Sequence, residues 1–413
     1  MLRDNLLSLL LAAAAVTPSS AVFLYATSYN DHAVTTLDLD VKSGKLTTLS
    51  KSLDCGSEPT WLTLNKADKV LYCLNEGWSG NSSITSYRTT ANGTLATLDI
   101  IPVLKSPVSS TLYGPNNSGL AVAHYDTSTF STFSVGEVTQ VALSQNETYE
   151  LPEPGPVPDR QDVPHLHDAV LDPTGQFIIV PDLGADALHV YSIVPGTIKW
   201  VELDPVKAVP GNGPRHGVFA VTGDDNSTFF YLANELSNTI TGFKVDYEDE
   251  DGEVTAAPVF TQLFDISTHG KGGHVPNGTK AAELEISPDN KFLLVSSRGE
   301  NLLKIPSFGN DDGPYTNTTQ IPSDPIVTFA IDGASGLLGD PVVQEAPAGG
   351  RDPRGFSLNR DGTLVASALQ DDNRVVVYER DVATGELGRV VAWASVGDVS
   401  ADGNGPNYVL FDD

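Results

Sequence analysis

A pair of strand-like segments separated by a turn recurs along this chain. The first segment of a pair usually opens with proline, and the second is rich in β-branched and aromatic residues. Clear copies begin near residues 59, 164, 214, 281 and 353, and a degenerate copy at 120–125 fills the widest gap. Repeats of roughly 40 to 50 residues with four strands each are typical of a β-propeller.

The two ends of the chain each supply half of a repeat. Residues 23–27 resemble a second strand without a first, and residues 406–411 resemble a first strand without a second. One blade shared between the termini predicts an all-β, seven-bladed β-propeller. The C-terminal strand then joins the N-terminal blade and closes the ring, so that no sheet edge stays open at the seam. We expect one propeller domain over residues 22–413.

Residues 1–21 have the pattern of a signal peptide. Arg3 precedes an apolar run over residues 6–16 that is too short to span a bilayer. Small residues at Ser19 and Ala21 fit a signal peptidase site. No second apolar stretch approaches the roughly 20 residues of a membrane anchor. The sequence therefore predicts cleavage near Ala21 and a secreted, extracellular protein.

Secretion would expose the chain to oxidation and glycosylation. Cys55 and Cys73 are the only cysteines, and an oxidising compartment allows them to form a disulfide, although their spacing alone does not decide it. Glycosylation in surface loops is expected at seven N-x-S/T sequons, namely Asn81, Asn92, Asn116, Asn146, Asn226, Asn277 and Asn317.

The composition bears on the partners of the protein. With 24 Lys and Arg against 53 Asp and Glu, the formal net charge is −29, which repels phosphate backbones and anionic membranes. No G-x-S-x-G, P-loop, H-E-x-x-H or Rossmann glycine motif occurs. We expect a monomer that binds a small molecule and neither nucleic acid nor membrane.

Chemistry is expected at one face of the ring. In each blade the first strand starts and the antiparallel second strand ends at the same face, which we call the mouth. Polar groups converge there from first-strand starts (His165, His167, Arg215, His216, Glu283, Arg354) and from second-strand ends (Tyr29, Glu76, Tyr125, Asp182, Glu235, Arg298, Gln370). Basic groups gathered in an acidic body suit a carboxylate or an oxyanion. Strand ends that merely meet water are the simpler alternative.

The histidine pair is the most specific feature of this face. His165 and His167 have the i, i+2 spacing that places both imidazoles on one face of a strand, which suits a metal or a general base. No cysteine or carboxylate stands at a recognised metal-ligand spacing. We therefore favour a general base and expect no metal.

The segments 160–167, 171–175 and 181–186, together with 213–216 and 234–237, resemble the lactonase family of seven-bladed propellers. That family includes 6-phosphogluconolactonases and 3-carboxy-cis,cis-muconate lactonizing enzymes. The resemblance spans the mature chain. It implies no metal or other cofactor. It also implies an active site formed by the histidine of P-H-x-H, the arginine of G-P-R-H, the glutamate of N-E-L and the arginine of S-R-G, here His165 or His167, Arg215, Glu235 and Arg298.

As a protein expected to be secreted, this chain also resembles the secreted fungal aldonolactonases of the lactonase family. We therefore expect a lactone hydrolase acting on gluconolactone or cellobionolactone. Arg215 and Arg298 would hold the carbonyl oxygen, one of the two imidazoles would activate water, and Glu235 would orient that imidazole or deliver a proton. Further substrate contacts are expected from Tyr29, Glu76, Trp78, Tyr125, His216, Asn234, Arg354 and Gln370.

Two other functions remain open from the sequence. A muconate cycloisomerase needs the same cationic mouth with one acid–base group, and a propeller without enzymatic activity could bind a ligand through the same face. Trp78 illustrates the ambiguity, because an indole beside the mouth could stack on a sugar ring or serve only in packing.

Overall fold

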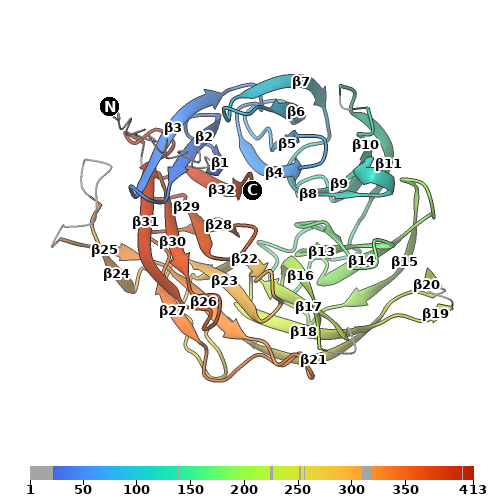
Figure 1. Cartoon of the computed structure of the whole chain (residues 1–413). Helices are drawn as coiled ribbons and strands as arrows, with labels where there is room; N and C mark the ends of the chain where they lie inside the picture. Colours follow the sequence, from blue (N-terminus) through green and yellow to red (C-terminus); the bar gives the residue numbers. More distant parts are fainter. Residues whose placement is uncertain are drawn as a thin grey trace, which may run out of the picture.

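Seven four-stranded antiparallel sheets surround a central axis (Figure 1). The computed structural model describes residues 22–137, 139–223, 227–250, 253–254, 256–308, 319–401 and 403–413. The predicted signal peptide and the sequons at Asn226 and Asn317 lie outside these residues. The seven-bladed propeller predicted from the repeats is confirmed.

In chain order, six blades are continuous and the seventh joins the two ends. Their strands are β4 (Pro59–Asn65), β5 (Val70–Asn75), β6 (Ser83–Thr89) and β7 (Leu95–Pro102); β8 (Pro107–Tyr113), β9 (Gly119–His124), β10 (Thr129–Ser134) and β11 (Ala142–Thr148); β12 (Val170–Leu171), β13 (Phe177–Asp182), β14 (Ala187–Ile193) and β15 (Trp200–Lys207); β16 (Pro214–Thr222), β17 (Ser227–Asn234), β18 (Thr239–Asp246) and β21 (Val259–Ser267); β22 (Lys280–Ile286), β23 (Phe292–Arg298), β26 (Pro325–Ala330) and β27 (Gln344–Pro347); β28 (Pro353–Leu358), β29 (Leu364–Leu369), β30 (Arg374–Arg380) and β31 (Leu387–Ser395); and β32 (Pro406–Phe411) with β1 (Val22–Ser28), β2 (Ala33–Asp40) and β3 (Lys45–Ser52).

Small additions decorate the ring. Two hairpins pair β19 (Asp249–Glu250) with β20 (Glu253–Val254) and β24 (Leu303–Pro306) with β25 (Gln320–Ser323). A short 3-10 helix, η1 (Pro115–Asn117), lies between β8 and β9. Within the described residues, no helix is long and apolar enough to cross a membrane.

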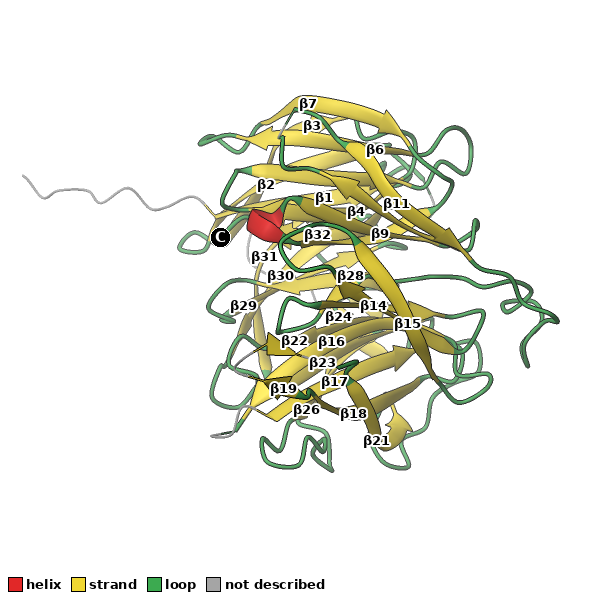
Figure 2. Cartoon of the chain, turned by 90° about the vertical axis from the view of Figure 1, so that its right-hand side faces the viewer, coloured by secondary structure: helices red, strands yellow, loops and turns green. Residues whose placement is uncertain are grey.

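The core lies between neighbouring blades. Every residue of β5, β9, β13 and β29 is buried, because the second strand of a blade has a strand on either side and another blade against each face. Outer strands such as β3 and β11 are largely exposed. Figure 2 shows the disc from its edge, with the connecting loops gathered at its two faces.

The ring closes through the two chain ends, as predicted. β32 pairs antiparallel with β1, placing Leu24 opposite Phe411 and Thr27 opposite Tyr408, so the C-terminus lies beside the innermost strands (Figure 1). Val409 and Phe411 are 0% and 2% exposed. The Nδ2 group of Asn407 also donates to the carbonyl oxygen of Pro59 at 2.9 Å, which ties the closing strand to the next blade.

One predicted strand is wrong in its extent. Residues 165–171 were expected to form a first strand, but only Val170 and Leu171 join the sheet, as β12, with an isolated bridge from Leu166 to Asp182. Backbone hydrogen bonds from the N–H of His167 to the carbonyl oxygen of Pro181 and from the N–H of Leu183 to that of His165, both 2.9 Å long, flank this bridge. The Asp182 carboxylate also accepts the backbone N–H of His165 at 2.8 Å. The two histidines therefore lie on either side of a single bridge outside the regular strand, and both rings contact Tyr125.

The described sequons are all exposed, at Asn81, Asn92, Asn116, Asn146 and Asn277. Four of them lie outside β-strands, as expected. Asn146 lies instead on β11, the outermost strand of its blade. An outer strand presents its side chains to solvent, so this position is still open to modification.

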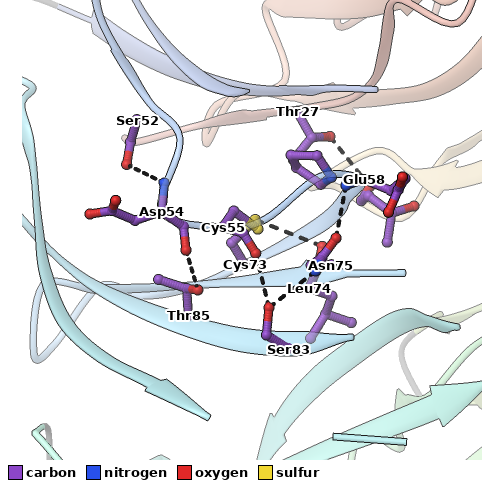
Figure 3. The surroundings of a disulfide bond; sticks show 12 residues. Thr27, Ser52, Asp54, Cys55, Glu58, Cys73, Leu74, Asn75, Ser83 and Thr85 are labelled. Carbon is purple, nitrogen blue, oxygen red and sulfur yellow. Dashed lines mark hydrogen bonds between the residues drawn. A yellow bond between two sulfur atoms is a disulfide. The ribbon is translucent and has the colours of Figure 1, made fainter. Parts of the chain in front are cut away.

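Cys55 and Cys73 form a disulfide with a Cα–Cα distance of 5.9 Å. The bond joins the loop before β4 to the middle of β5 (Figure 3). Hydrogen bonds hold the same loop to β6, since Ser83 Oγ donates to the carbonyl oxygen of Cys55 at 3.0 Å and Thr85 Oγ1 to that of Asp54 at 2.8 Å. The disulfide thus fastens the entry into this blade.

Replacing both Cys55 and Cys73 with Ala should lower the free energy of unfolding by about 2 to 4 kcal/mol, because the bond closes a loop over a sequence separation of 18 residues. Denaturant unfolding of the variant against the wild type measures the loss, and wild type unfolded under a reducing agent is the control. An unchanged midpoint in the variant would contradict the prediction.

Deleting residues 406–413 should leave β1 without its inner partner and open the ring. Val409 and Phe411 alone are each worth about 1.5 to 3 kcal/mol when buried, against a typical net stability of about 5 to 15 kcal/mol. The truncated protein should aggregate or melt at a lower temperature. Deleting only residue 413 keeps every β1–β32 pair and the bonds of Asp412 to β1, and is the matched control; a long truncation that melts like wild type would refute closure by this strand.

Candidate functional site

A bulge at the mouth end of the inner strands shapes the centre of the ring. In six blades the register of the first strand shifts near its opening end, after the first residue in five of them and after Ala281, the second residue, in β22, so that one or two residues have no partner on the neighbouring strand. Bulges re-aim side chains. The re-aimed residues are Thr60, Val108, Arg215, Glu283, Arg354 and Asn407, and His167 supplies the equivalent position in the blade of β12.

These seven residues, one from each blade, line a small cavity on the axis of the ring together with Trp61 and His216. A wider pocket of about 260 Å³ lies against it and shares Val108, His167 and Arg354 with the cavity. The other pocket residues follow the second strands or come from loops, and are Glu76, Trp78, Tyr125, Asp126, Arg160, Glu235, Lys280 and Arg298.

Glu235 is the electrostatic centre of the pocket. Its Oε1 lies 2.6 Å from Arg160 Nη2, and its Oε2 lies 3.0 Å from Arg298 Nη2 and 3.1 Å from Arg215 Nε. Burial raises the pKa of Glu235, but the charges of the three guanidiniums outweigh burial and hold that pKa well below its usual range. The carboxylate therefore stays ionised.

The contacts of Glu235 argue against the predicted roles as proton donor or histidine-orienting group. A carboxyl group with a strongly lowered pKa carries no proton to deliver near neutral pH. The ion pairs of Glu235 go to arginines, and its side chain forms no hydrogen bond with a histidine of the described residues. Its position suits holding Arg160, Arg215 and Arg298 in place.

Two cations at the pocket have no such partner. The side chains of Lys280 and Arg354 form no hydrogen bond or ion pair with the described residues, although the Arg354 Cζ atom lies 5.8 Å from the centre of the Tyr29 ring. Burial lowers the pKa of Lys280. Burial likewise lowers the pKa of Arg215 to about 10, with Arg298 adding to the effect, so Arg215 remains cationic at neutral pH.

The two predicted histidines have different surroundings. His167 lines both the pocket and the cavity. Burial and the nearby Arg215 hold the pKa of His167 well below its usual range, so its imidazole is neutral. His165 lines neither space; it stacks on Tyr125 with 4.1 Å between ring centres, and its Nε2 lies 3.0 Å from Asp162 Oδ1.

Of the other residues predicted to contact substrate, some line the pocket or the cavity and others lie outside both spaces. Glu76, Trp78, Tyr125 and Arg354 line the pocket, and His216 lines the cavity. Tyr29 lies behind them, where it donates to Glu76 and contacts the Trp78 ring. Asn234 and Gln370 line neither space, because Asn234 bonds Thr239 and Thr241 within its own blade and Gln370 bonds Asn404.

Sequence reasoning missed Arg160, Asp126 and Lys280 as pocket residues. Arg160 belongs to the long segment between β11 and β12, and only the folded chain brings its guanidinium to Glu235. Lys280 opens β22, so a search of every first-strand start would have found it. Among the described residues, no group of three or more His, Cys, Asp or Glu side chains is arranged to hold a metal ion.

Comparison with known proteins agrees with this architecture. Residues 23–401 match the family described as "Lactonase, 7-bladed beta-propeller". The "Probable 6-phosphogluconolactonase" of Arthroderma benhamiae is 29% identical over 360 residues, covering 87% of this chain and 82% of that protein. The 6-phosphogluconolactonase of Formosa agariphila is 26% identical, covering 85% and 89%.

Among solved structures, the periplasmic gluconolactonase of Pseudomonas aeruginosa superposes with a TM-score of 0.73 at 25% identity, covering 95% of this chain and 99% of that one. The family match spans nearly the whole ring, including the strands that supply the pocket. The chain therefore belongs to the lactonase family of seven-bladed β-propellers.

Proposed function

We propose that the protein hydrolyses sugar lactones, with aldono-1,5-lactones such as gluconolactone as substrates. The observation that carries the proposal is that Arg354 and Lys280, two cations without an ion-pair partner, line the same pocket as Glu235 and its partners Arg160 and Arg298. Lactone hydrolysis passes through a tetrahedral intermediate with negative charge on the former carbonyl oxygen. A guanidinium fixed in a partly buried pocket stabilises that charge.

The remaining groups of the pocket suit a sugar ring. Glu76 and Asp126 offer carboxylates that accept hydrogen bonds from hydroxyl groups. The Trp78 ring is 50% exposed and its Nε1 donates to Glu76 Oε2 at 2.6 Å, which orients the indole beside the pocket. Drug-sized ligands occupy about 300 to 1,000 Å³, so a pocket of about 260 Å³ suits one ring.

A second pocket of about 440 Å³ shares Arg160, Glu235 and Lys280 with the first. This space could extend the site to a two-ring substrate such as cellobionolactone. Asn277, one of the exposed sequons, lines it. A glycan at Asn277 would therefore stand at the edge of the extended site.

The relatives support hydrolysis over cyclisation. The three proteins compared above are named for lactone hydrolysis, and none of them for muconate cyclisation. Secretion is part of the proposal, and it rests on the pattern of residues 1–21, the exposed sequons and the disulfide. Outside the cell, lactones formed by oxidation of glucose or of cello-oligosaccharides are the substrates that such an enzyme meets.

Incubation with glucono-1,5-lactone should release acid faster than the spontaneous reaction, as followed with a pH indicator. Arg354→Ala should lower kcat by about 10² or more, because it removes a cation aimed at the developing oxyanion. Arg389→Ala removes an exposed arginine of β31 outside the site and should keep wild-type activity. Loss of muconate absorbance without lactonase activity would instead favour the cycloisomerase, and saturable binding without turnover a binding protein.

Glu235→Gln should lower the free energy of unfolding by about 3 to 5 kcal/mol, because three buried or half-buried guanidiniums lose their shared counter-charge. The folded-state pKa of Glu235 is depressed, so its contribution is present above the ordinary glutamate pKa of about 4.3 and is lost as the pH falls towards the depressed value. The stability difference should therefore persist from pH 5 to 8 and narrow under more acidic conditions.

Thermal or denaturant unfolding at several pH values measures this difference. Glu379→Gln is the matched control, because Glu379 forms an exposed pair with Arg389 on the outer strands and such pairs contribute at most about 1 kcal/mol. Equal stability of Glu235→Gln and wild type at pH 7 would show that the arginines do not depend on this carboxylate.

A further inference from the structure

The cavity beneath the pocket contains unpartnered polar atoms. His167 Nδ1, Arg215 Nη1, His216 Nε2 and Glu283 Oε2 are buried and have no hydrogen-bond partner among the described residues. All four residues line the same cavity, and each is no more than 7% exposed. A buried polar atom without a partner destabilises the fold, so the cavity suits a small polar molecule that would pair with these atoms.

The size of the cavity fits one water molecule. The space open to the centre of a water molecule measures about 10 Å³, close to the minimum for a single buried water, and such a water makes two to four hydrogen bonds. Arg215 Nη1 can donate to its oxygen. His216 Nε2 and Glu283 Oε2 can accept its two hydrogens.

His216 has the geometry of a general base toward this position. Its Nδ1 lies 2.8 Å from Glu283 Oε1. A carboxylate only accepts hydrogen bonds, so Nδ1 carries the proton and Nε2 presents its lone pair. The carboxylate is itself fixed by the backbone, because the N–H of Leu284 donates to the same Oε1 at 3.2 Å. A histidine oriented by a carboxylate, with the other nitrogen facing water, is an arrangement that activates the water.

We propose that this cavity binds the hydrolytic water, that His216 is the catalytic base that activates it, and that Glu283 is the positioning residue for His216. The inference rests on the proposed lactone hydrolysis. Sequence reasoning placed the base at His165 or His167. His165 lies outside both spaces, and His167, whose ring centre lies 5.1 Å from that of His216, forms no hydrogen bond or ion pair with a carboxylate of the described residues.

The step balances as ordinary hydrolysis. The water passes one proton to His216 Nε2 while its oxygen forms a bond to the lactone carbonyl carbon, and the carbonyl electron pair moves onto the oxyanion. As the oxyanion collapses, the bond between this carbon and the ring oxygen breaks. The ring oxygen takes up the proton from His216, leaving a neutral imidazole and the open hydroxy acid. Val108, His167 and Arg354 line both spaces, so the cavity adjoins the pocket in which the lactone would bind.

The test uses His216→Gln, Glu283→Gln and the double variant in the lactone assay. General-base catalysis contributes about 10² to 10⁴ in rate, so His216→Gln should lower kcat at least 100-fold with a KM within about 3-fold of wild type. Glu283→Gln should lower kcat by a smaller factor. The double variant should be no slower than His216→Gln, because residues that act as a unit are not additive; a merely structural Glu283 would add its own loss.

His269→Gln is the matched control. His269 is also buried and its Nε2 lies 3.1 Å from a glutamate oxygen, on Glu300, but neither residue lines the pocket or the cavity. This variant should keep wild-type kcat. A His216→Gln protein that melts like wild type and retains more than a third of wild-type kcat would overturn the assignment of the base.

A crystal structure tests the water independently of activity. Wild type should show a density peak within 3.2 Å of both His216 Nε2 and Arg215 Nη1, and His216→Leu should lack it. Density for a protein side chain filling the cavity would refute the water site. Wild type that turns over no lactone would instead refute the proposed function, and the density peak would still decide whether the cavity binds water.

Discussion

Pairing between β1 and β32 is the constraint on which this structure depends. A blade has an apolar face on either side, and only a closed ring covers all fourteen such faces by contact with neighbours. The chain achieves this by giving its last strand to its first blade, so that Leu24 faces Phe411 across the seam. The same closure brings Asn407 into the central cavity beside Thr60. The pairing of β32 with β1 therefore completes both the ring of blades and the lining of the central cavity.

Sevenfold geometry explains why a single site forms. The bulges at the mouth each turn one residue toward the axis, and seven blades supply seven residues to one small space. All of these residues except Val108 are polar, and four of them, His167, Arg215, Glu283 and Arg354, have ionisable side chains that a blade on its own would leave exposed to water. Their chemistry arises from being brought together, where burial and mutual charge change their behaviour.

The electrostatics of the centre oppose those of the body. The chain has a net charge of −29, yet the pocket gathers four cationic side chains, Arg160, Lys280, Arg298 and Arg354, over the buried Arg215. Glu235 reduces the repulsion between these positive charges, because it forms ion pairs with three of the arginines. Arg354 and Lys280 are not among the partners of Glu235, so the pocket retains positive charge for a substrate.

The sequence by itself determined the blade count and the closing strand, because strand alternation and turn residues are local properties that repeat along the chain. It also predicted that Arg215, Glu235 and Arg298 lie at one face of the ring, and the structure brings these three side chains into contact. Only the tertiary structure decided the partners of these groups. Arg160 meets Glu235 across 75 positions, and His216 meets Glu283 across 67, so no local pattern could reveal either pair. Tertiary contacts likewise hold His165 outside the pocket, since its ring stacks on Tyr125 and its Nε2 lies 3.0 Å from Asp162 Oδ1.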